Sequence, residues 1–159
     1  MSAALSPDPA LPAPADPGYE QRVRASFGRQ RFMSTLGASM THVAPGEVDV
    51  ELPFDGELTQ QHGFLHGGAV ASVLDSACGY AAATLMPADS GVLTVEFKIN
   101  FLAPAAGERF RFAGRVRRAG RTVTFVDGDA IAVDAGRERT IATMQATMMT
   151  VRGRDDVRH

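Results

Sequence analysis

The order of its predicted elements places this chain in the α+β class, as one curled antiparallel sheet of about six strands around a single long helix. Three observations lead to this prediction. One apolar run with helical periodicity lies in the middle of the chain, segments with strand-like alternation lie on both sides of it, and turns with glycine or proline separate those segments. A single helix covers only one face of such a sheet, so we expect the sheet to curl around it.

The chain opens with a leader, residues 1–18, that is rich in proline and alanine and shows no periodicity. We expect this leader to lack regular structure or to lie loosely on the domain. A helix is predicted over residues 19–36, with an apolar side made of Val23, Phe27, Phe32 and Leu36. A single domain is therefore expected to span residues 19–151, and a charged tail, residues 152–159, follows it.

Two short strands are predicted within residues 40–54, on either side of the Pro45-Gly46 turn. The central helix follows over residues 65–85. Many of its residues are small, which lets the helix lie close against a sheet. Its core-facing positions have helical spacing and are Val70, Val73, Leu74, Ala77 and Ala81.

After Pro87 the periodicity changes from helical to alternating. One face of this strand is predicted to carry Val95, Phe97, Ile99 and Phe101, and the other Thr94, Glu96, Lys98 and Asn100. Three more strands are predicted within residues 110–116, 122–133 and 140–151, separated by turns at Ala119-Gly120 and Ala135-Gly136. We expect these four strands to form a meander. The uncovered sheet edge and second face argue for a dimer or a larger assembly.

Length and composition agree with a small globular protein. The 159 residues suit one domain, and 45% hydrophobic with 21% charged residues is ordinary globular composition. The net charge of −2 gives no reason to expect nucleic acid as a partner. A single cysteine, Cys78, excludes an intrachain disulfide and a cysteine-based zinc cluster.

The same sequence gives no sign of a membrane or metal partner. No run approaches the ~18 apolar residues that cross a membrane, and no basic-then-apolar leader opens the chain. No spacing of histidines and acids indicates a metal site. We therefore expect a cytoplasmic protein without a metal, a cofactor or a membrane contact.

The segment that precedes the central helix points to chemistry. Residues 60–68 read QQHGFLHGG, and a lone carboxylate, Asp75, follows inside the apolar helix. Gly67 and Gly68 lack Cβ atoms, so a ligand can approach the backbone closely. The first N–H groups of a helix have no intrahelical partner and carry the positive end of its dipole. This loop can therefore hold an anion, or an oxygen that becomes one. The alternative is a plain loop-to-helix junction.

The spacing between the glycines and the acid limits what one chain can do. Gly67 and Asp75 are eight residues apart, which corresponds to ~12 Å along a helix axis. An aspartate side chain cannot attack a carbonyl group held that far away on the same helix. Either the two groups serve different purposes, or one site combines residues from two chains.

Two segments resemble a known family. Residues 60–75, QQHGFLHGGAVASVLD, resemble the active-site segment of hotdog-fold acyl-CoA thioesterases, in particular the phenylacetate-degradation branch. Residues 94–107, TVEFKINFLAPAAG, resemble that family's strand ending in a Pro-x-x-Gly turn. The resemblance runs from about residue 32 to residue 151. It implies a hotdog fold, hydrolysis of an acyl-CoA or aryl-CoA thioester, and active sites shared across a homodimer, commonly within a dimer of dimers.

The resemblance also implies how the two chains divide the site. One chain would supply Gln60, His66 and the Gly67 amide, and its partner would supply Asp75 and Thr94. The Gly67 N–H would stabilise the carbonyl oxygen, and Asp75 would act as nucleophile or as general base for water. A carboxylate in an apolar helix is costly unless it is paired. The alternative for Asp75 is a hydrogen-bonding residue at the helix surface or an interface.

Among the remaining residues of this region, His66 and Thr94 have two interpretations each. Gln60 stands where the phenylacetate branch usually carries asparagine, so we expect a carboxamide role with a longer side chain. His66 either polarises the thioester or braces the loop, and Thr94 either positions water and Asp75 or is an ordinary strand residue. His62 is interpreted as structural, and Cys78 as a buried small hydrophobe rather than a nucleophile.

The last candidate feature is basic. Four arginines surround the predicted Ala119-Gly120 hairpin: Arg115, Arg117, Arg118 and Arg121. Arginine matches phosphate geometry, so this turn is predicted to bind the nucleotide phosphates of coenzyme A. Arg118 and Arg121 are the preferred pair, and Gly68 is a further substrate-binding candidate. The alternatives are a solvated hairpin and, for the whole protein, a hotdog protein that binds acyl-CoA or a related ligand without turnover.

Overall fold

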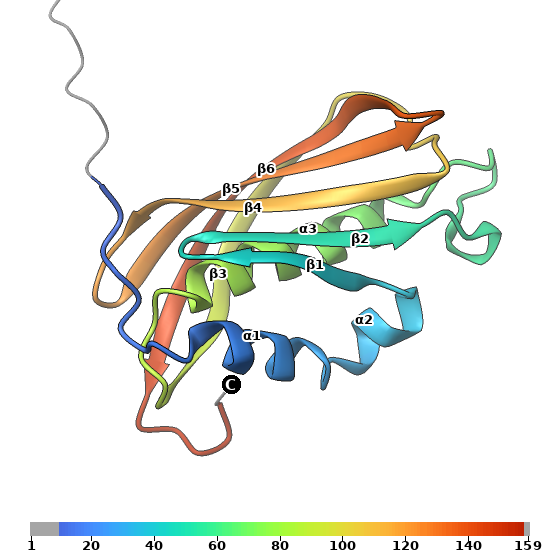
Figure 1. Cartoon of the computed structure of the whole chain (residues 1–159). Helices are drawn as coiled ribbons and strands as arrows, with labels where there is room; N and C mark the ends of the chain where they lie inside the picture. The colour runs from blue at the N-terminus through green and yellow to red at the C-terminus, as the bar shows by residue number, and fades with distance from the viewer. Residues whose placement is uncertain (1–9, 158–159) are drawn as a thin grey trace, which may run out of the picture.

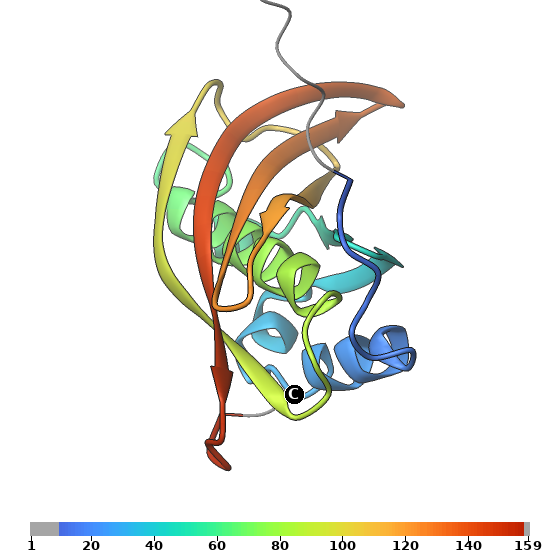
Figure 2. The same ribbon diagram turned by 90° about the vertical axis from the view of Figure 1, so that its left-hand side faces the viewer.

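A six-stranded antiparallel sheet curls around one long helix, α3 (Gly67–Ala83), in the computed structural model of the chain (Figure 1). The view turned by 90° about the vertical axis shows α3 lying inside the curved sheet (Figure 2). This arrangement confirms the predicted fold class. The strands are β1 (Ser39–Ala44), β2 (Glu47–Pro53), β3 (Ser90–Phe101), β4 (Arg109–Ala119), β5 (Val123–Asp134) and β6 (Arg137–Arg152).

The structure describes residues 10–157, so the prediction for the start of the leader, residues 1–9, lies outside the described part. Residues 10–18 form no helix or strand and lie against the domain. The Ala15 N–H donates to the Leu85 carbonyl at 3.4 Å, and Asp16 forms an ion pair with Arg22 at 2.8 Å. Within residues 10–157, no helix is long and apolar enough to cross a membrane.

The N-terminal helix differs from the prediction. It is interrupted, and forms α1 (Tyr19–Phe27) and α2 (Arg31–Leu36). The Gln30 backbone between them is extended, with φ −74° and ψ 98°. The helix therefore does not continue from α1 into α2, and the side chains of α2 point in directions other than those of one continuous helix. Phe32, predicted on the core side, is therefore 56% exposed. A short 3₁₀ turn, η1 (Gly56–Leu58), follows β2.

The strand order also corrects the prediction of a four-strand meander. The order in the sheet is β1-β2-β4-β5-β6-β3, so only β4, β5 and β6 form a meander. Strand β3 pairs with β6, and β2 occupies the place beside β4. The chain reverses direction at each hairpin within the meander, whereas β3 is reached through α3 and lies at the far edge (Figure 2).

Close packing between α3 and the sheet depends on small residues on both sides. A Cβ atom at Gly114 of β4 would lie 2.5 Å from the Ala77 carbonyl oxygen of α3. A Cβ atom at Gly128 of β5 would lie 2.7 Å from Cys78 Sγ. Because neither strand position carries a side chain, the helix backbone can approach the sheet. Burial raises the pKa of the Cys78 thiol, which suits a structural rather than a nucleophilic role.

A β-bulge decides which way the β3 side chains point. The register of β3 against β6 shifts between Thr94 and Glu96. Strict alternation predicts Thr94 and Phe101 on opposite faces. In the structure Thr94 contacts Asp75 and Phe101 contacts Gly67, so both point toward α3. The bulge at Val95 supplies the one extra residue that brings both side chains to the helix side.

The outer edge of β3 is long and apolar. This 12-residue strand lies at one end of the sheet order and pairs on one side only. Its exposed apolar residues are Leu93 at 43%, Val95 at 56%, Phe97 at 41% and Phe101 at 55%. Long apolar edge strands are a liability that natural proteins usually cover.

Candidate active site

The loop before α3 is held closed by backbone hydrogen bonds. The Gln60 N–H donates to the Phe64 carbonyl at 2.9 Å, and the Gly63 N–H donates back to the Gln60 carbonyl at 2.9 Å. Gly63 has a φ of +80°, a conformation that favours glycine. The Leu65 N–H donates to the Ala105 carbonyl at 3.0 Å, so Leu65 remains extended. The helix therefore begins at Gly67 and not, as predicted, at Leu65.

His66 caps the N-terminus of α3. Its Nδ1 accepts a hydrogen bond from the Gly68 N–H at 2.8 Å. Because Nδ1 accepts, the neutral ring carries its proton on Nε2. The contact occupies the Gly68 amide, whereas the Gly67 N–H makes no hydrogen bond to any residue in the range 10–157. Gly67 thus presents a free donor at the positive end of the helix.

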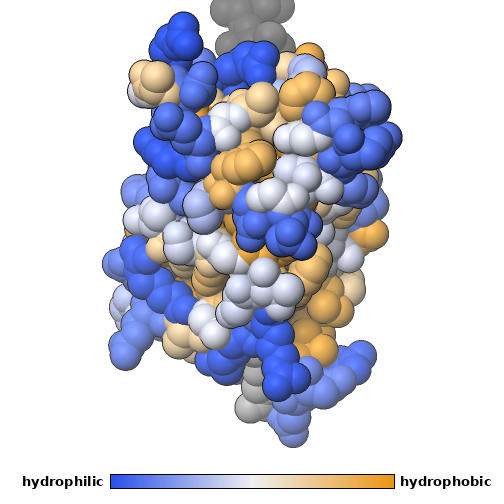
Figure 3. Space-filling view, turned by 90° about the vertical axis from the view of Figure 1, so that its right-hand side faces the viewer, coloured by the Kyte–Doolittle hydropathy of each residue, from blue (hydrophilic) through white to orange (hydrophobic). Residues whose placement is uncertain are grey.

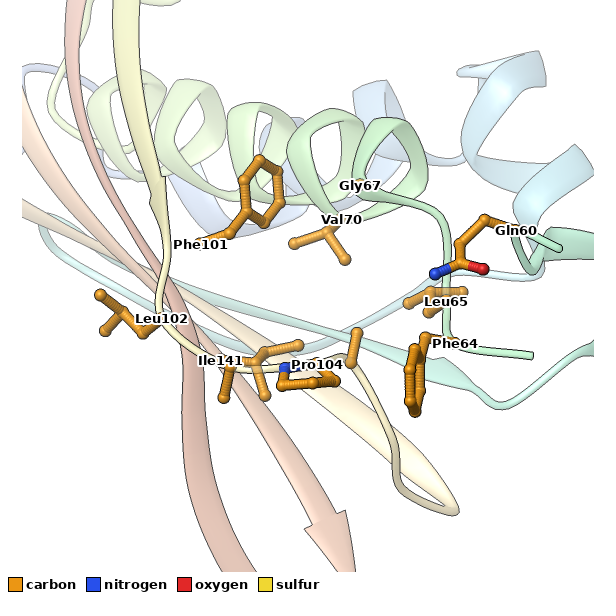
Figure 4. A pocket seen from close by; sticks show the side chains of 11 residues that line it. Gln60, Phe64, Leu65, Gly67, Val70, Phe101, Leu102, Pro104 and Ile141 are labelled. Carbon is orange, nitrogen blue, oxygen red and sulfur yellow. The ribbon is translucent and has the colours of Figure 1, made fainter. Parts of the chain in front are cut away.

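Gly67 borders a cavity of about 480 Å³ between the loop, α3 and the end of β3 (Figure 4). A Cβ atom at Gly67 would lie 3.2 Å from Cζ of Phe101, so the aromatic ring packs directly against this glycine. Gln60 also lines the cavity. Its Oε1 accepts a hydrogen bond from the His62 N–H, and its amide nitrogen is drawn on the cavity side in Figure 4. This cavity therefore combines two N–H donors with an apolar wall.

Asp75 lies in a second cavity, of about 390 Å³, near the middle of α3. The Thr94 hydroxyl donates a hydrogen bond to Asp75 Oδ1 at 2.9 Å. Burial raises the pKa of the Asp75 carboxyl above its usual value, and the Thr94 hydrogen bond opposes that change. A carboxylate with a raised pKa is a stronger base than an ordinary aspartate.

The two cavities have no lining residue in common. The structure therefore brings Gln60, His66 and Gly67 together at one end of α3, and it brings Asp75 and Thr94 together elsewhere. One protomer therefore holds these candidate residues in two separate groups. This separation agrees with the ~12 Å predicted along the helix axis.

Several residues that line the two cavities were not predicted from the sequence to do so. Phe101 was predicted as a strand residue, without its contact to Gly67. The far part of the Asp75 cavity is polar: Tyr80 and Ser26 are within hydrogen-bond distance at 3.2 Å, and the Ser76 hydroxyl donates to Gln30 Oε1 at 3.3 Å. Ser76 and Tyr80, two polar residues in a mostly apolar helix, were the sequence signal for this part of the cavity.

The arginines near the β4–β5 hairpin fall into two groups. Arg115 forms an ion pair with Asp49 at 2.6 Å, and Arg117 forms one with Asp127 at 3.1 Å. Arg118 and Arg121 are exposed and make no ion pair or hydrogen bond with any residue that the structure describes. The two arginines preferred from the sequence are thus the two that remain available to a ligand. Arg152, missed in the sequence, lines a small cavity together with Arg121.

The surface around the loop that precedes Gly67 is mixed in character. Figure 3 faces the end of the molecule that carries this loop, and it shows hydrophobic surface between hydrophilic groups. Phe54, near the loop, is 44% exposed. Among residues 10–157, no three His, Cys, Asp or Glu side chains are placed to hold a metal ion together.

Comparison with known proteins assigns the family. The model of the thioesterase superfamily matches residues 62–138. A crystal structure of a thioesterase family protein from Silicibacter pomeroyi is 57% identical, with a TM-score of 0.84, and the match covers 86% of this chain and all of that chain. The chain therefore belongs to the thioesterase superfamily.

More distant relatives agree with this assignment. A putative esterase of Saccharolobus solfataricus is 39% identical over 58% of this chain, and the chain spans 65% of that relative's length. Human acyl-coenzyme A thioesterase 13 is 29% identical over 67% of this chain and 77% of its own length. The PaaI protein of the E. coli phenylacetic acid degradation operon shares the fold, with a TM-score of 0.73 at 21% identity over 84% of this chain and 93% of that one.

Proposed function

We propose that this protein hydrolyses the thioester of an acyl-CoA or aryl-CoA to the free acid and coenzyme A. One observation carries the proposal: a half-buried carboxylate, Asp75, held by Thr94 in a cavity beside α3, in a member of the thioesterase superfamily. Among residues 10–157, Thr94 is the one hydrogen-bond donor to this partly buried carboxylate. Such burial is costly for folding, so a chemical role accounts for its presence.

The residue types assign the steps of the reaction. The thioester carbonyl oxygen would accept hydrogen bonds from the Gly67 N–H and the Gln60 amide nitrogen, which stabilise the negative charge that develops there. Asp75 would either attack the carbonyl carbon or remove a proton from the attacking water. The C–S bond then breaks, and the coenzyme A thiolate leaves and takes up a proton. Where Asp75 is the nucleophile, water then hydrolyses the anhydride between Asp75 and the acyl group, which releases the free acid and restores the carboxylate. Thr94 would orient the Asp75 carboxylate, and His66 would hold the loop through the Gly68 amide.

We propose that the two half-sites meet across a homodimer. Gly67 lies beside Phe101 at one end of β3, and Asp75 lies beside Thr94 in its first half, so α3 and β3 run in opposite directions. A two-fold axis near the middle of β3 would pair this strand with its copy in antiparallel fashion. The Gly67 end of one protomer would then face the Asp75 end of the other. Such pairing would also cover the exposed apolar edge of β3.

Two observations support the proposal that the substrate carries coenzyme A: the name of a relative, and the arginine pair Arg118 and Arg121. Human acyl-coenzyme A thioesterase 13 carries that substrate class in its name. Arg118 and Arg121 are free to bind the nucleotide phosphates. A dimer of dimers and a cytoplasmic location remain predictions from the sequence and its resemblance.

The test is a panel of acyl-CoA and aryl-CoA thioesters, with released thiol detected by a chromogenic thiol reagent. We expect catalytic release with at least one straight-chain or aromatic member, and release at least about 10²-fold slower with Asp75→Asn. An exposed aspartate, Asp89, provides the matched control Asp89→Asn, which should retain full activity. Tight binding of several members without thiol release would instead identify a binding protein.

A further inference from the structure

A further cavity lies at the end of the molecule away from Gly67. It has a volume of about 250 Å³ and is enclosed by the leader, the chain just after α3, the β4–β5 hairpin and the end of β6. Figure 1 shows this hairpin and the loop before α3 at opposite ends of the molecule. The cavity shares no lining residue with the cavities of Gly67 and Asp75. It is therefore separate from both groups of candidate catalytic residues.

Two threonine side chains in this cavity are buried without a hydrogen-bond partner. Thr124 of β5 is 2% exposed, Thr150 of β6 is 9% exposed, and both line the cavity. Neither hydroxyl group makes a hydrogen bond with any residue in the range 10–157. Thr124 is opposite Met148, two residues before Thr150, so the two threonines are diagonal neighbours on one face, ~7–8 Å apart. One ligand can therefore reach both hydroxyl groups. We call this space the threonine cavity.

Buried hydroxyl groups elsewhere in the core do have partners. The Thr84 hydroxyl accepts a hydrogen bond from the Gly46 N–H at 2.7 Å and donates one to the Ala81 carbonyl at 2.7 Å. The Ser90 hydroxyl donates to the Pro87 carbonyl at 2.6 Å. Buried polar groups in native proteins are almost always hydrogen-bonded, and an exception calls for an explanation. The two threonines of the threonine cavity therefore indicate a partner from outside the chain.

The threonine cavity is also positively charged. Arg121 of the hairpin and Arg152 at the end of β6 line it, and both are exposed. Neither arginine forms an ion pair or a side-chain hydrogen bond with any residue that the structure describes. Among residues 10–157, no acidic side chain lines this cavity. Two unpaired cations beside two hydroxyl groups form a site for a small anion.

The other walls are apolar and keep the site small. Leu85, just after α3, is buried on one side, and Pro12 and Ala15 of the leader lie on the other. The Ala15 N–H donates to the Leu85 carbonyl at 3.4 Å, which holds the leader against the domain. Next to Pro12, Leu11 packs so closely on Gly46 that a Cβ atom there would lie 2.6 Å from Leu11 Cδ1. The leader is thus a positioned wall of the cavity.

We propose that the threonine cavity binds a phosphate monoester group. A phosphate group has three terminal oxygens, which suit two guanidinium groups and two hydroxyl groups better than the two oxygens of a carboxylate do. Two sources share this chemistry: the phosphate on the ribose of coenzyme A, and a separate phosphorylated molecule. The proposal goes beyond thioester hydrolysis, because the site is remote from Asp75 and binding there is measured without turnover.

Titration calorimetry with inorganic phosphate tests the site. The wild-type protein, Thr124→Val and Arg152→Ala are compared in chloride buffer at constant ionic strength. We expect saturable binding of one phosphate per wild-type chain, and a Kd about 10-fold higher in each variant, the usual effect of losing one hydrogen bond to a charged group. Thr124→Val removes a hydroxyl group that has no partner in residues 10–157, so its Tm should be no lower than that of the wild type.

Two further variants serve as matched controls. Thr140→Val changes an exposed threonine of β6, and Arg137→Ala changes an exposed arginine of the β5–β6 hairpin. Both should bind phosphate with the wild-type Kd. The proposal is overturned if the wild-type protein shows no saturable binding, or if its Kd equals those of Thr124→Val and Arg152→Ala. Should Thr124→Val fail to fold, Arg152→Ala carries the test alone, because its side chain is exposed.

Coenzyme A and dephospho-coenzyme A, which lacks the ribose phosphate, distinguish the two sources. If the coenzyme supplies the group, coenzyme A binds about 10-fold tighter than its dephospho form, and Arg152→Ala removes the difference. If a separate molecule supplies it, the two forms bind alike, and inorganic phosphate still binds in the presence of saturating coenzyme A. Both results support the site. A failure to hydrolyse any thioester would refute the proposed function and leave these binding results unchanged.

Discussion

Thr94 Oγ1 donates a hydrogen bond to Asp75 Oδ1 at 2.9 Å, and it does so only because a β-bulge lies between Thr94 and Glu96. The bond favours the charged form of the carboxylate, whereas burial favours the neutral form. The pKa of Asp75 is raised, so burial is the larger of the two effects. The hydrogen bond from β3 therefore limits how far burial raises the pKa of Asp75.

Replacing Asp75 tests the reaction directly. We expect Asp75→Asn to leave the fold and the oligomeric state unchanged and to lower kcat by at least about 10²-fold, the usual loss for a general base or nucleophile. Steady-state kinetics and size-exclusion chromatography measure the two effects. Near-wild-type turnover would remove Asp75 from the mechanism.

The same substitution should stabilise the protein at neutral pH. Since the folded-state pKa of Asp75 is raised, folding favours the protonated carboxyl. This contribution is fully present below the usual value of 3.8 and is lost as the pH rises through the raised folded-state pKa. The ionised carboxylate therefore destabilises the fold at pH ~7, and asparagine does not titrate.

Thermal unfolding as a function of pH measures this difference. Asp75→Asn should have the higher Tm at neutral pH, and a rise of about 2–4 °C would correspond to ~1 kcal/mol for a chain of this size. The gain should shrink as the pH falls toward 4. A lower Tm for Asp75→Asn at neutral pH would show that the carboxylate is structural, because a stabilising partner would then be lost.

Removing the Thr94 hydroxyl should change the pH dependence of the reaction. In Thr94→Val the hydrogen bond that favours the charged carboxylate is lost, so the pKa of Asp75 rises further. If ionised Asp75 is the reacting form, the acid limb of kcat/KM moves to higher pH. Thr94→Ser, which retains a hydroxyl, is the matched control and should keep the wild-type profile. Coincident acid limbs for the valine and serine variants would refute this role of Thr94.

Mixed dimers test whether one site combines two chains. Gly67→Ala places a methyl group 3.2 Å from Phe101 Cζ, displacing the amide donor, and we expect kcat to fall by about 10²-fold. Mixed with Asp75→Asn, it forms heterodimers in which one site of two carries both intact residues. Random exchange should therefore restore about one quarter of the wild-type activity. If fully exchanged mixtures stay inactive, Gly67 and Asp75 do not act together in one site shared by two chains.

The free arginine pair predicts a defect in binding rather than in chemistry. Arg118→Ala and Arg121→Ala should raise KM for acyl-CoA and leave kcat nearly unchanged, because contacts remote from the thioester act equally in the ground and transition states. The effect should vanish with a pantetheine thioester, which lacks the nucleotide phosphates. Arg117→Ala is a suitable control, since Arg117 is paired with Asp127. Unchanged KM values in both variants would place the phosphate site elsewhere.

Local patterns in the sequence were sufficient for the fold class and for most of the chemical groups. Helical and alternating periodicities depend on neighbouring residues, and turns depend on glycine and proline, so the central helix and the strands were predictable. The Gly67 loop and Asp75 were recognisable because glycines before a helix, and an acid within an apolar one, are local features too. Helix geometry alone predicted that Gly67 and Asp75 are too far apart to act together in one chain.

Only the tertiary structure decided how those groups are arranged. The position of β3 beside β6 depends on pairing between distant segments, which no local pattern encodes. Because of the bulge at Val95, the Thr94 side chain lies on the same face of β3 as Phe101, whereas alternation predicts the opposite face. The extended backbone at Gln30 leaves Phe32 outside the core. The contact of Val157 with Gly91 joins two segments about sixty residues apart, because packing, unlike periodicity, is set by whatever the folded chain brings together.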